Sequence, residues 1–85
     1  MFKSADDLLD ALTRVLINFR EGIPREKASL TDDDFQQVLS EAYERGFVTG
    51  LLPLKLVGRS GTQFKIAPDA KITLEGLSFL ESSIK

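Results

Sequence analysis

The first regular pattern in the chain is a helical stripe of apolar side chains between residues 5 and 21. Apolar residues recur there every three or four positions, which is the spacing of one face of an α-helix. Ser4 is placed to cap the first turn, while Gly22 and Pro24 end the pattern. We therefore expect a helix over residues 5–21, with Ile17 on the side opposite the apolar stripe.

A second helical stripe follows Thr31, which is a suitable N-cap residue. Asp32 to Asp34 come next, and carboxylates in a first turn interact favourably with the helix dipole. Gly46 ends this stripe, so a helix is predicted near residues 32–45. The connecting residues 23–30 have room for a short strand or for one helical turn.

After Gly46 the apolar residues no longer follow helical spacing, and the pattern becomes strand-like. Residues 47–57 read as a strand, although Pro53 lacks a backbone donor and favours an edge strand or a bulge. Residues 58–61 contain two glycines and predict a turn. Residues 62–67 then alternate between apolar and polar side chains, so the two stretches predict a β-hairpin.

Alternation in the second strand places Phe64 and Ile66 on the inner face and Gln63 and Lys65 on the solvent side. Residues 68–70 are expected to turn the chain once more. The last helix then begins near Leu74, with Thr73 as its cap.

The terminal helix is apolar over more than half of its girth, because Leu74 and Phe79 point away from the stripe formed by Leu77 and Leu80. Helices of this kind are usually covered on two sides. Leu74 and Phe79, with Ile17, are therefore candidate contacts with a protein partner or with a second copy of the chain.

The order of elements predicts one domain, residues 1–85, of α+β class with mainly helical content. It is the order of a winged helix-turn-helix: a three-helix core, a β-hairpin wing and a C-terminal helix. The expected core consists of Leu8, Leu9, Leu12, Val15, Leu16, Phe19, Phe35, Val38, Leu39, Ala42, Phe47, Phe64, Ile66, Leu77 and Leu80.

Two stretches carry a family resemblance. Residues 30–50 (LTDDDFQQVLSEAYERGFVTG) look like the third helix of a winged helix and its exit into the wing. Residues 72–81 (ITLEGLSFLE) are similar to the entry to the terminal helix of many winged-helix proteins. In a chain this short, the sequence resembles the small YjcQ-like winged-helix proteins of bacteria and prophages. The resemblance implies a winged-helix fold and a DNA-binding role, with no catalytic residues.

Composition limits the chemistry. The chain has no cysteine and no histidine, so thiolate nucleophiles, imidazole bases and the usual zinc ligands are absent. The Asp32-x-Asp34 pair does not continue as a calcium loop, because Gln37 and Tyr43 stand where that loop needs glycine and glutamate. We expect no enzyme activity, no metal, no cofactor and no small-molecule substrate. With no apolar span and no signal sequence, we also expect no membrane association and a cytoplasmic location.

Charge is distributed unevenly along the chain. Residues 1–50 hold 6 basic and 10 acidic side chains, whereas residues 51–85 hold 5 basic and 3 acidic ones. The grouped cations of the second part are Lys55, Arg59, Lys65 and Lys71. They are the candidate nucleic-acid contacts, on a wing that reaches duplex DNA. The alternative is an ordinary solvated hairpin, whose cations prevent edge-to-edge aggregation.

The outer face of the predicted helix 32–45 has the wrong sign for a DNA-reading surface. It carries Asp33, Gln37, Ser40 and Glu44, flanked by Gln36 and Glu41. Gln37 and Ser40 have the chemistry to contact base edges, but the carboxylates repel phosphates. Two functions stay open: a DNA-binding protein, such as a transcriptional regulator, that binds weakly through its wing, and a winged-helix protein-interaction module that does not bind DNA.

Overall fold

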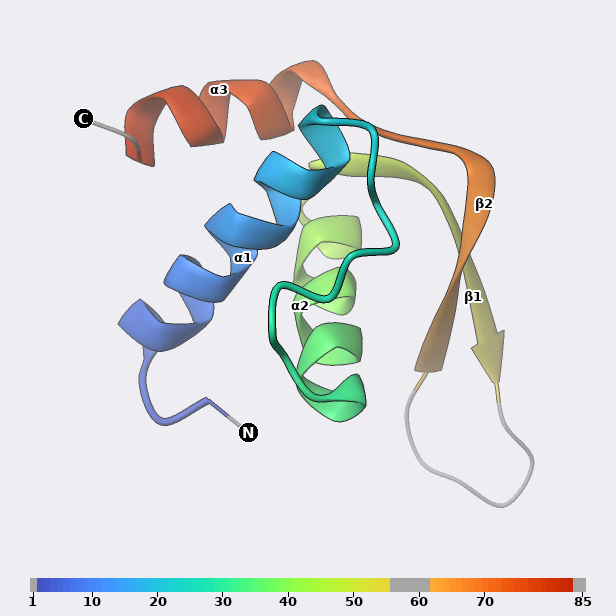
Figure 1. Ribbon diagram of the computed structural model, residues 1–85, viewed down its shortest axis with the longest axis horizontal. Coiled ribbons are helices and arrows are strands. Elements are labelled where there is room, and N and C mark those ends of the chain that lie inside the picture. Colours follow the sequence, from blue (N-terminus) through green and yellow to red (C-terminus); the bar gives the residue numbers. More distant parts are fainter. Residues whose placement is uncertain (1, 56–61, 84–85) are drawn as a thin grey trace.

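The computed structural model describes residues 2–55 and 62–83 (Figure 1). Within these residues the chain forms three helices and a two-stranded antiparallel hairpin, which makes it a small α+β structure. The elements follow in the order α1 (Ala5–Arg20), α2 (Asp32–Glu44), β1 (Val48–Lys55), β2 (Thr62–Ile72) and α3 (Leu74–Ser83).

The helices surround one apolar core, and the hairpin projects from its side (Figure 1). Helix α1 packs against α2, α3 and β2, while α2 also contacts both strands. Helix α3 lies next to the C-terminal end of α1 (Figure 1). The hairpin is thus attached to the helices through α2 and α1.

Both predicted helix starts are confirmed by capping contacts. The Ser4 hydroxyl accepts a hydrogen bond from the Asp7 amide at 3.2 Å, and the Thr31 hydroxyl accepts one from the Asp34 amide at 3.2 Å. Each cap satisfies a backbone N–H that has no partner within its helix. The acidic run after Thr31 therefore has a structural explanation in helix capping.

The prediction of a short strand or helical turn in residues 23–30 is wrong. This segment forms irregular turns between α1 and α2. Ala28 and Ser29 both adopt left-handed backbone conformations, with φ of 52° and 65°. Neither a helix nor a strand tolerates two such residues in succession. Among the described residues, the second helix of the expected three-helix core is therefore missing.

The hairpin register is interrupted at one point. Thr49 pairs with Lys71 and Leu51 pairs with Ile66, so Gly50 alone stands opposite residues 67–70. The predicted turn at residues 68–70 is thus wrong, because β2 runs on to Ile72 and accommodates these residues as an irregularity.

Gly50 makes this crossing possible. Its φ is 82°, and a Cβ atom there would lie 2.5 Å from the Cα of Ala70. Only glycine tolerates both the conformation and the approach. The predicted turn at residues 58–61 falls outside the described residues, although the pairing of Lys55 with Thr62 shows that the strands form a hairpin.

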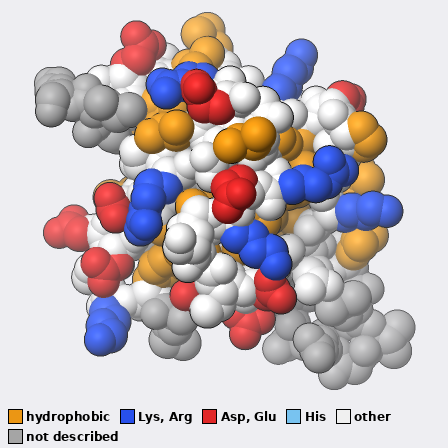
Figure 2. Space-filling view, in the orientation of Figure 1, with side chains coloured by type: hydrophobic (Ala, Val, Ile, Leu, Met, Phe, Trp, Pro, Cys, Tyr) orange, Lys and Arg blue, Asp and Glu red, His pale blue; other side chains and the backbone are white. Residues whose placement is uncertain are grey.

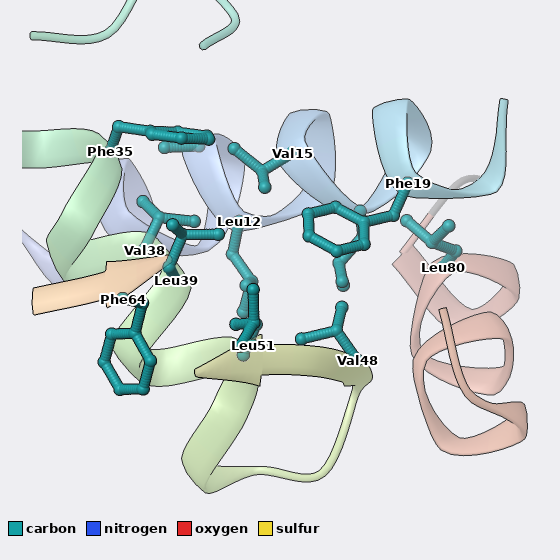
Figure 3. Close-up of a cluster of buried hydrophobic side chains, with 13 residues drawn as sticks. Leu12, Val15, Phe19, Phe35, Val38, Leu39, Val48, Leu51, Phe64 and Leu80 are labelled. Carbon is teal, nitrogen blue, oxygen red and sulfur yellow. The ribbon is translucent and has the colours of Figure 1, made fainter. Parts of the chain in front are cut away.

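The core combines the inner faces of all five elements (Figure 3). Most of the predicted core is confirmed, and Ala11, Val48 and Leu51 are buried although they are not in the predicted set. Five predicted core residues are only partly buried: Leu8, Leu9, Phe47, Ile66 and Leu77. The first four of them pack against the core. The buried side chains are Ala11, Leu12, Val15, Leu16, Phe19, Phe35, Val38, Leu39, Ala42, Val48, Leu51, Phe64 and Leu80.

The start of α3 is tied to the end of α2. The Thr73 amide donates to the Phe47 carbonyl at 2.8 Å, and its hydroxyl donates to the Gly46 carbonyl at 2.6 Å. The same hydroxyl accepts from the Gly76 amide at 3.1 Å, which confirms Thr73 as the predicted cap. One threonine thus caps α3 and holds it against the chain that leaves α2.

Close packing at this junction requires a glycine. A Cβ atom at Gly76 would lie 2.4 Å from the Phe47 carbonyl oxygen and 2.6 Å from Cγ1 of Ile72. Because one contact is with backbone, the clash cannot be relieved by rotating a side chain alone. Glycine is therefore required at position 76 because of the close packing against Phe47, and not because of the helix conformation.

We expect Gly76→Ala to destabilise the fold by about 1–3 kcal/mol, as other overpacked sites do. Urea unfolding measures the change, with Ser78→Ala on the exposed side of α3 as the control. The control should stay within about 0.5 kcal/mol of the parent chain. A Gly76→Ala variant stabilised by about 1 kcal/mol, as at an unconstrained helix position, would contradict the packing argument.

Candidate nucleic-acid interface

The hairpin presents two different faces. Phe64 is buried and Ile66 is half-buried on the side of the helices, while Gln63 and Lys65 are exposed, as predicted. Lys65 stands opposite Leu52 in the ladder. Because side chains alternate along a strand, these residues share the outer face of the hairpin.

Strand β2 carries two exposed lysines. Lys65 and Lys71 are exposed, and neither forms an ion pair with any other described residue. Figure 2 shows basic side chains beside hydrophobic ones over the hairpin. The cations outside the hairpin are largely paired: Arg14 with Asp10, Arg20 with Glu21, Lys27 with Asp32 and Arg45 with Glu41.

The structure places the other predicted basic residues only in part. Lys55 is the last residue of β1, and its side chain lies outside the described part of the chain. Arg59 falls wholly outside the described residues. Lys65 and Lys71 lie on one strand, on either side of the irregularity at residues 67–70. Of the predicted basic set, the described side chains are therefore those of Lys65 and Lys71, both on β2.

The exposed face of α2 is acidic. Asp33, Gln37 and Glu44 are exposed, and Ser40 is half-buried. Since carboxylates repel phosphate oxygens, they weaken contact between this face and a nucleic-acid backbone. Gln37 and Ser40 keep the hydrogen-bonding chemistry predicted for them, but they lie among acids.

The prediction that Gln36 flanks this outer face is wrong. Its side-chain amide faces the hairpin and makes two hydrogen bonds with the backbone of Phe64. Nε2 donates to the Phe64 carbonyl at 3.2 Å, and the Phe64 amide donates to Oε1 at 2.7 Å. A single side chain thus binds both polar groups of one strand residue.

Phe64 is held to α2 by its ring as well as by its backbone. The rings of Tyr43 and Phe64 lie 5.0 Å apart at an interplanar angle of 46°. Gln36 and Tyr43 are seven residues apart, which is two helical turns, so they lie on one side of α2. This spacing is the one sequence signal that relates Gln36 to the hairpin-facing side of the helix.

The outer face of the hairpin is also unusually apolar. Leu52 and Leu54 are 50% and 46% exposed. They stand opposite Lys65 and Gln63 in the ladder. Two large apolar side chains therefore lie beside an unpaired cation on one solvent-facing surface, which we call the hairpin face (Leu52, Leu54, Gln63 and Lys65).

The three predicted partner-binding residues differ in exposure and in their neighbours. Leu74 is 75% exposed at the start of α3. Phe79 is half-buried and stacks on Phe47, with ring centroids 4.8 Å apart, so its ring is covered in part by its own chain. Ile17 is half-buried and lines a shallow pocket between α1 and residues 26–29.

No family model, curated protein or solved structure matches the chain. Over residues 2–55 and 62–83, no three acidic side chains lie close enough together to hold a metal ion. In the same part of the chain, no helix is both long enough and apolar enough to span a bilayer.

We expect Phe79→Ala to destabilise the fold by about 3 kcal/mol, because it removes a ring that packs on Phe47 and the core. Leu74→Ala on the same helix is the control and should change stability by less than about 0.5 kcal/mol. Thermal unfolding of both variants at two protein concentrations distinguishes packing from self-association. Equal stability of the two variants, with a concentration-dependent midpoint only in the parent chain, would instead place Phe79 in a dimer interface.

Proposed function

We propose that this chain is a winged-helix protein of bacterial or prophage origin that binds duplex DNA in the cytoplasm through its hairpin and acts as a transcriptional regulator. The observation that carries the proposal is the contrast between strand and helices. Lys65 and Lys71 are exposed on β2 without acidic partners among the described residues, whereas four of the six cations described outside the hairpin form ion pairs with neighbouring carboxylates.

Unpaired cations are what a nucleic-acid backbone requires. Lys and Arg side chains that contact phosphates release condensed counterions, and this release supplies much of the affinity. A cation already paired with a carboxylate contributes less, because its own partner must first be displaced. The hairpin therefore has the charge for this task, and α2 does not.

The order of elements supports a winged-helix layout, with the hairpin as the wing. Helix α2 runs into β1 as a third helix runs into its wing strand, and α3 follows as a terminal helix. The resemblance of residues 30–50 and 72–81 to YjcQ-like proteins agrees with this layout. The missing short helix in residues 23–30 leaves α2 as the helix next to the wing.

A protein partner is the second candidate, favoured by Leu52 and Leu54. Duplex DNA offers few apolar contacts to two leucines that are about half exposed, whereas protein interfaces bury such residues at their centre. Lys65 beside them would suit an acidic neighbour on that partner. In this alternative the hairpin face is the interface and α2 keeps its acidic surface in solvent.

The first test is charge reversal on β2. Lys65→Glu should weaken binding to duplex DNA by roughly tenfold, equivalent to about 1.4 kcal/mol. The parent chain should show a log–log salt slope of about −3 to −4 if Lys55, Arg59, Lys65 and Lys71 each contact a phosphate. A fluorescence-anisotropy titration at two salt concentrations measures both quantities.

Lys3→Glu is the matched control, because it changes the net charge equally at an exposed position before α1. It should leave the affinity within about twofold and the salt slope unchanged, since long-range charge effects are screened. An equal loss of DNA affinity in both variants would show that the affinity depends on net charge alone. An absence of binding by the parent chain at low salt would favour the protein-interaction alternative.

A second test adds charge to α2. Glu44→Lys should raise DNA affinity and steepen the salt slope by about one, because a repulsive carboxylate is replaced by a phosphate contact. Glu75→Lys at the exposed start of α3 changes the charge by the same amount and serves as its control. An unchanged affinity in Glu44→Lys would mean that α2 faces away from bound DNA.

A further inference from the structure

Strand β2 has two edges, and only one of them pairs with β1. Phe64 stands opposite Pro53, which has no N–H to donate. The N–H and carbonyl of Phe64 are both bound by Gln36, so they point away from β1. In an antiparallel ladder, backbone groups two residues apart point to the same edge. The groups of Ile66 therefore lie on this second edge too.

Side chains from the helical part cover that second edge. Gln36 on α2 binds Phe64, and Arg25 from the α1–α2 connection donates to the Ile66 carbonyl at 3.1 Å. A third strand in this place would satisfy the same backbone groups. Residues 23–30 lie before α2 and supply Arg25, but they form turns and no strand.

We propose that Gln36 and Arg25 act as a surrogate third strand, which fixes the hairpin to α2 and closes the β2 edge to pairing with a second copy of the chain. This inference does not depend on DNA binding. It rests on three side chain–backbone hydrogen bonds to two alternate residues of one strand, all directed at the edge opposite β1.

The chemistry of glutamine suits this role. Its terminal amide offers one donor and one acceptor in a plane, as a peptide group does, so it satisfies both the carbonyl and the N–H of Phe64. A carboxylate supplies acceptors only, and alanine supplies neither. Gln36 is half-buried and Arg25 is exposed, so water competes less for the Gln36 bonds. We therefore assign the larger part of the effect to Gln36.

Of the two edges of the hairpin, the β2 edge is the more prone to pair with another chain. An unpaired strand edge is a template for a further chain. The β1 edge carries Pro53, which removes one donor and hinders strand addition. Without Gln36, the N–H and carbonyl of Phe64 become free on β2. The β2 edge of a second copy, related by a two-fold axis, presents the same groups.

The direct experiment compares Gln36→Ala with Gln37→Ala. Both remove a glutamine from adjacent positions of α2, but Gln37 is exposed, and its side chain forms no hydrogen bond with a described residue of the hairpin. In Gln36→Ala, NMR hydrogen exchange of the Phe64 amide should be at least about tenfold faster than in the parent chain, because its acceptor is removed. Sedimentation should show a concentration-dependent dimer in Gln36→Ala and none in Gln37→Ala.

Unchanged Phe64 exchange in Gln36→Ala, or equal self-association in both variants, would overturn the proposal. If Gln36→Ala does not fold, Gln36→Glu tests the same contact in its place. At neutral pH its carboxylate faces the Phe64 carbonyl and cannot donate, whereas the protonated carboxyl both donates and accepts.

The sign of the pH effect in Gln36→Glu follows from this contact. The folded state favours the protonated carboxyl, so the pKa of the introduced side chain is raised on folding. The lost stability should return as the pH falls toward the ordinary glutamate pKa of about 4.3. The urea midpoint relative to the parent chain should therefore be lower at neutral pH than in acid. If the urea midpoints of Gln36→Glu and the parent chain differ by the same amount at both pH values, the proposal is also overturned.

Discussion

The two hydrogen bonds between the Gln36 amide and the Phe64 backbone connect the helical part of this molecule to its hairpin. Phe64 is the point where the contacts meet: its ring lies against Tyr43, its side chain enters the core, and its strand position is opposite Pro53. A two-stranded hairpin is marginal by itself and needs a packed face to be stable. Here α2 supplies that face with both apolar and polar contacts.

Fixing Phe64 also fixes the outer surface of the hairpin. A one-residue shift along a strand would exchange its two faces, so an inward Phe64 requires an outward Lys65. The same register leaves Leu52 and Leu54 in solvent. Hence the contacts that stabilise the hairpin also determine which side chains it presents to a ligand, while the acidic face of α2 stays separate from it.

The sequence predicts those elements whose signals are local. The spacing of apolar residues predicts α1 and α2, and capping chemistry predicts Ser4, Thr31 and Thr73 as N-caps. The alternation of apolar and polar residues predicts that Phe64 points inward. What it does not predict depends on contacts between distant residues. The approach of Gly50 to Ala70 lets β2 continue through residues 67–70, and Gln36 bonds to a residue 28 positions away. The left-handed Ala28 and Ser29 have no glycine to mark them. The basic candidates Lys65 and Lys71 were predictable, but the absence of ion pairs between them and other described residues was not.

The central claim is that the hairpin supplies the affinity for the ligand, and that α2 does not. Its most direct test is an NMR titration of isotope-labelled protein with a short DNA duplex at low salt. We predict that the largest chemical-shift changes lie on β2, around Lys65 and Lys71, with smaller changes at Gln37 and Glu44. Changes centred on α2 instead, with β2 unaffected, would contradict the account.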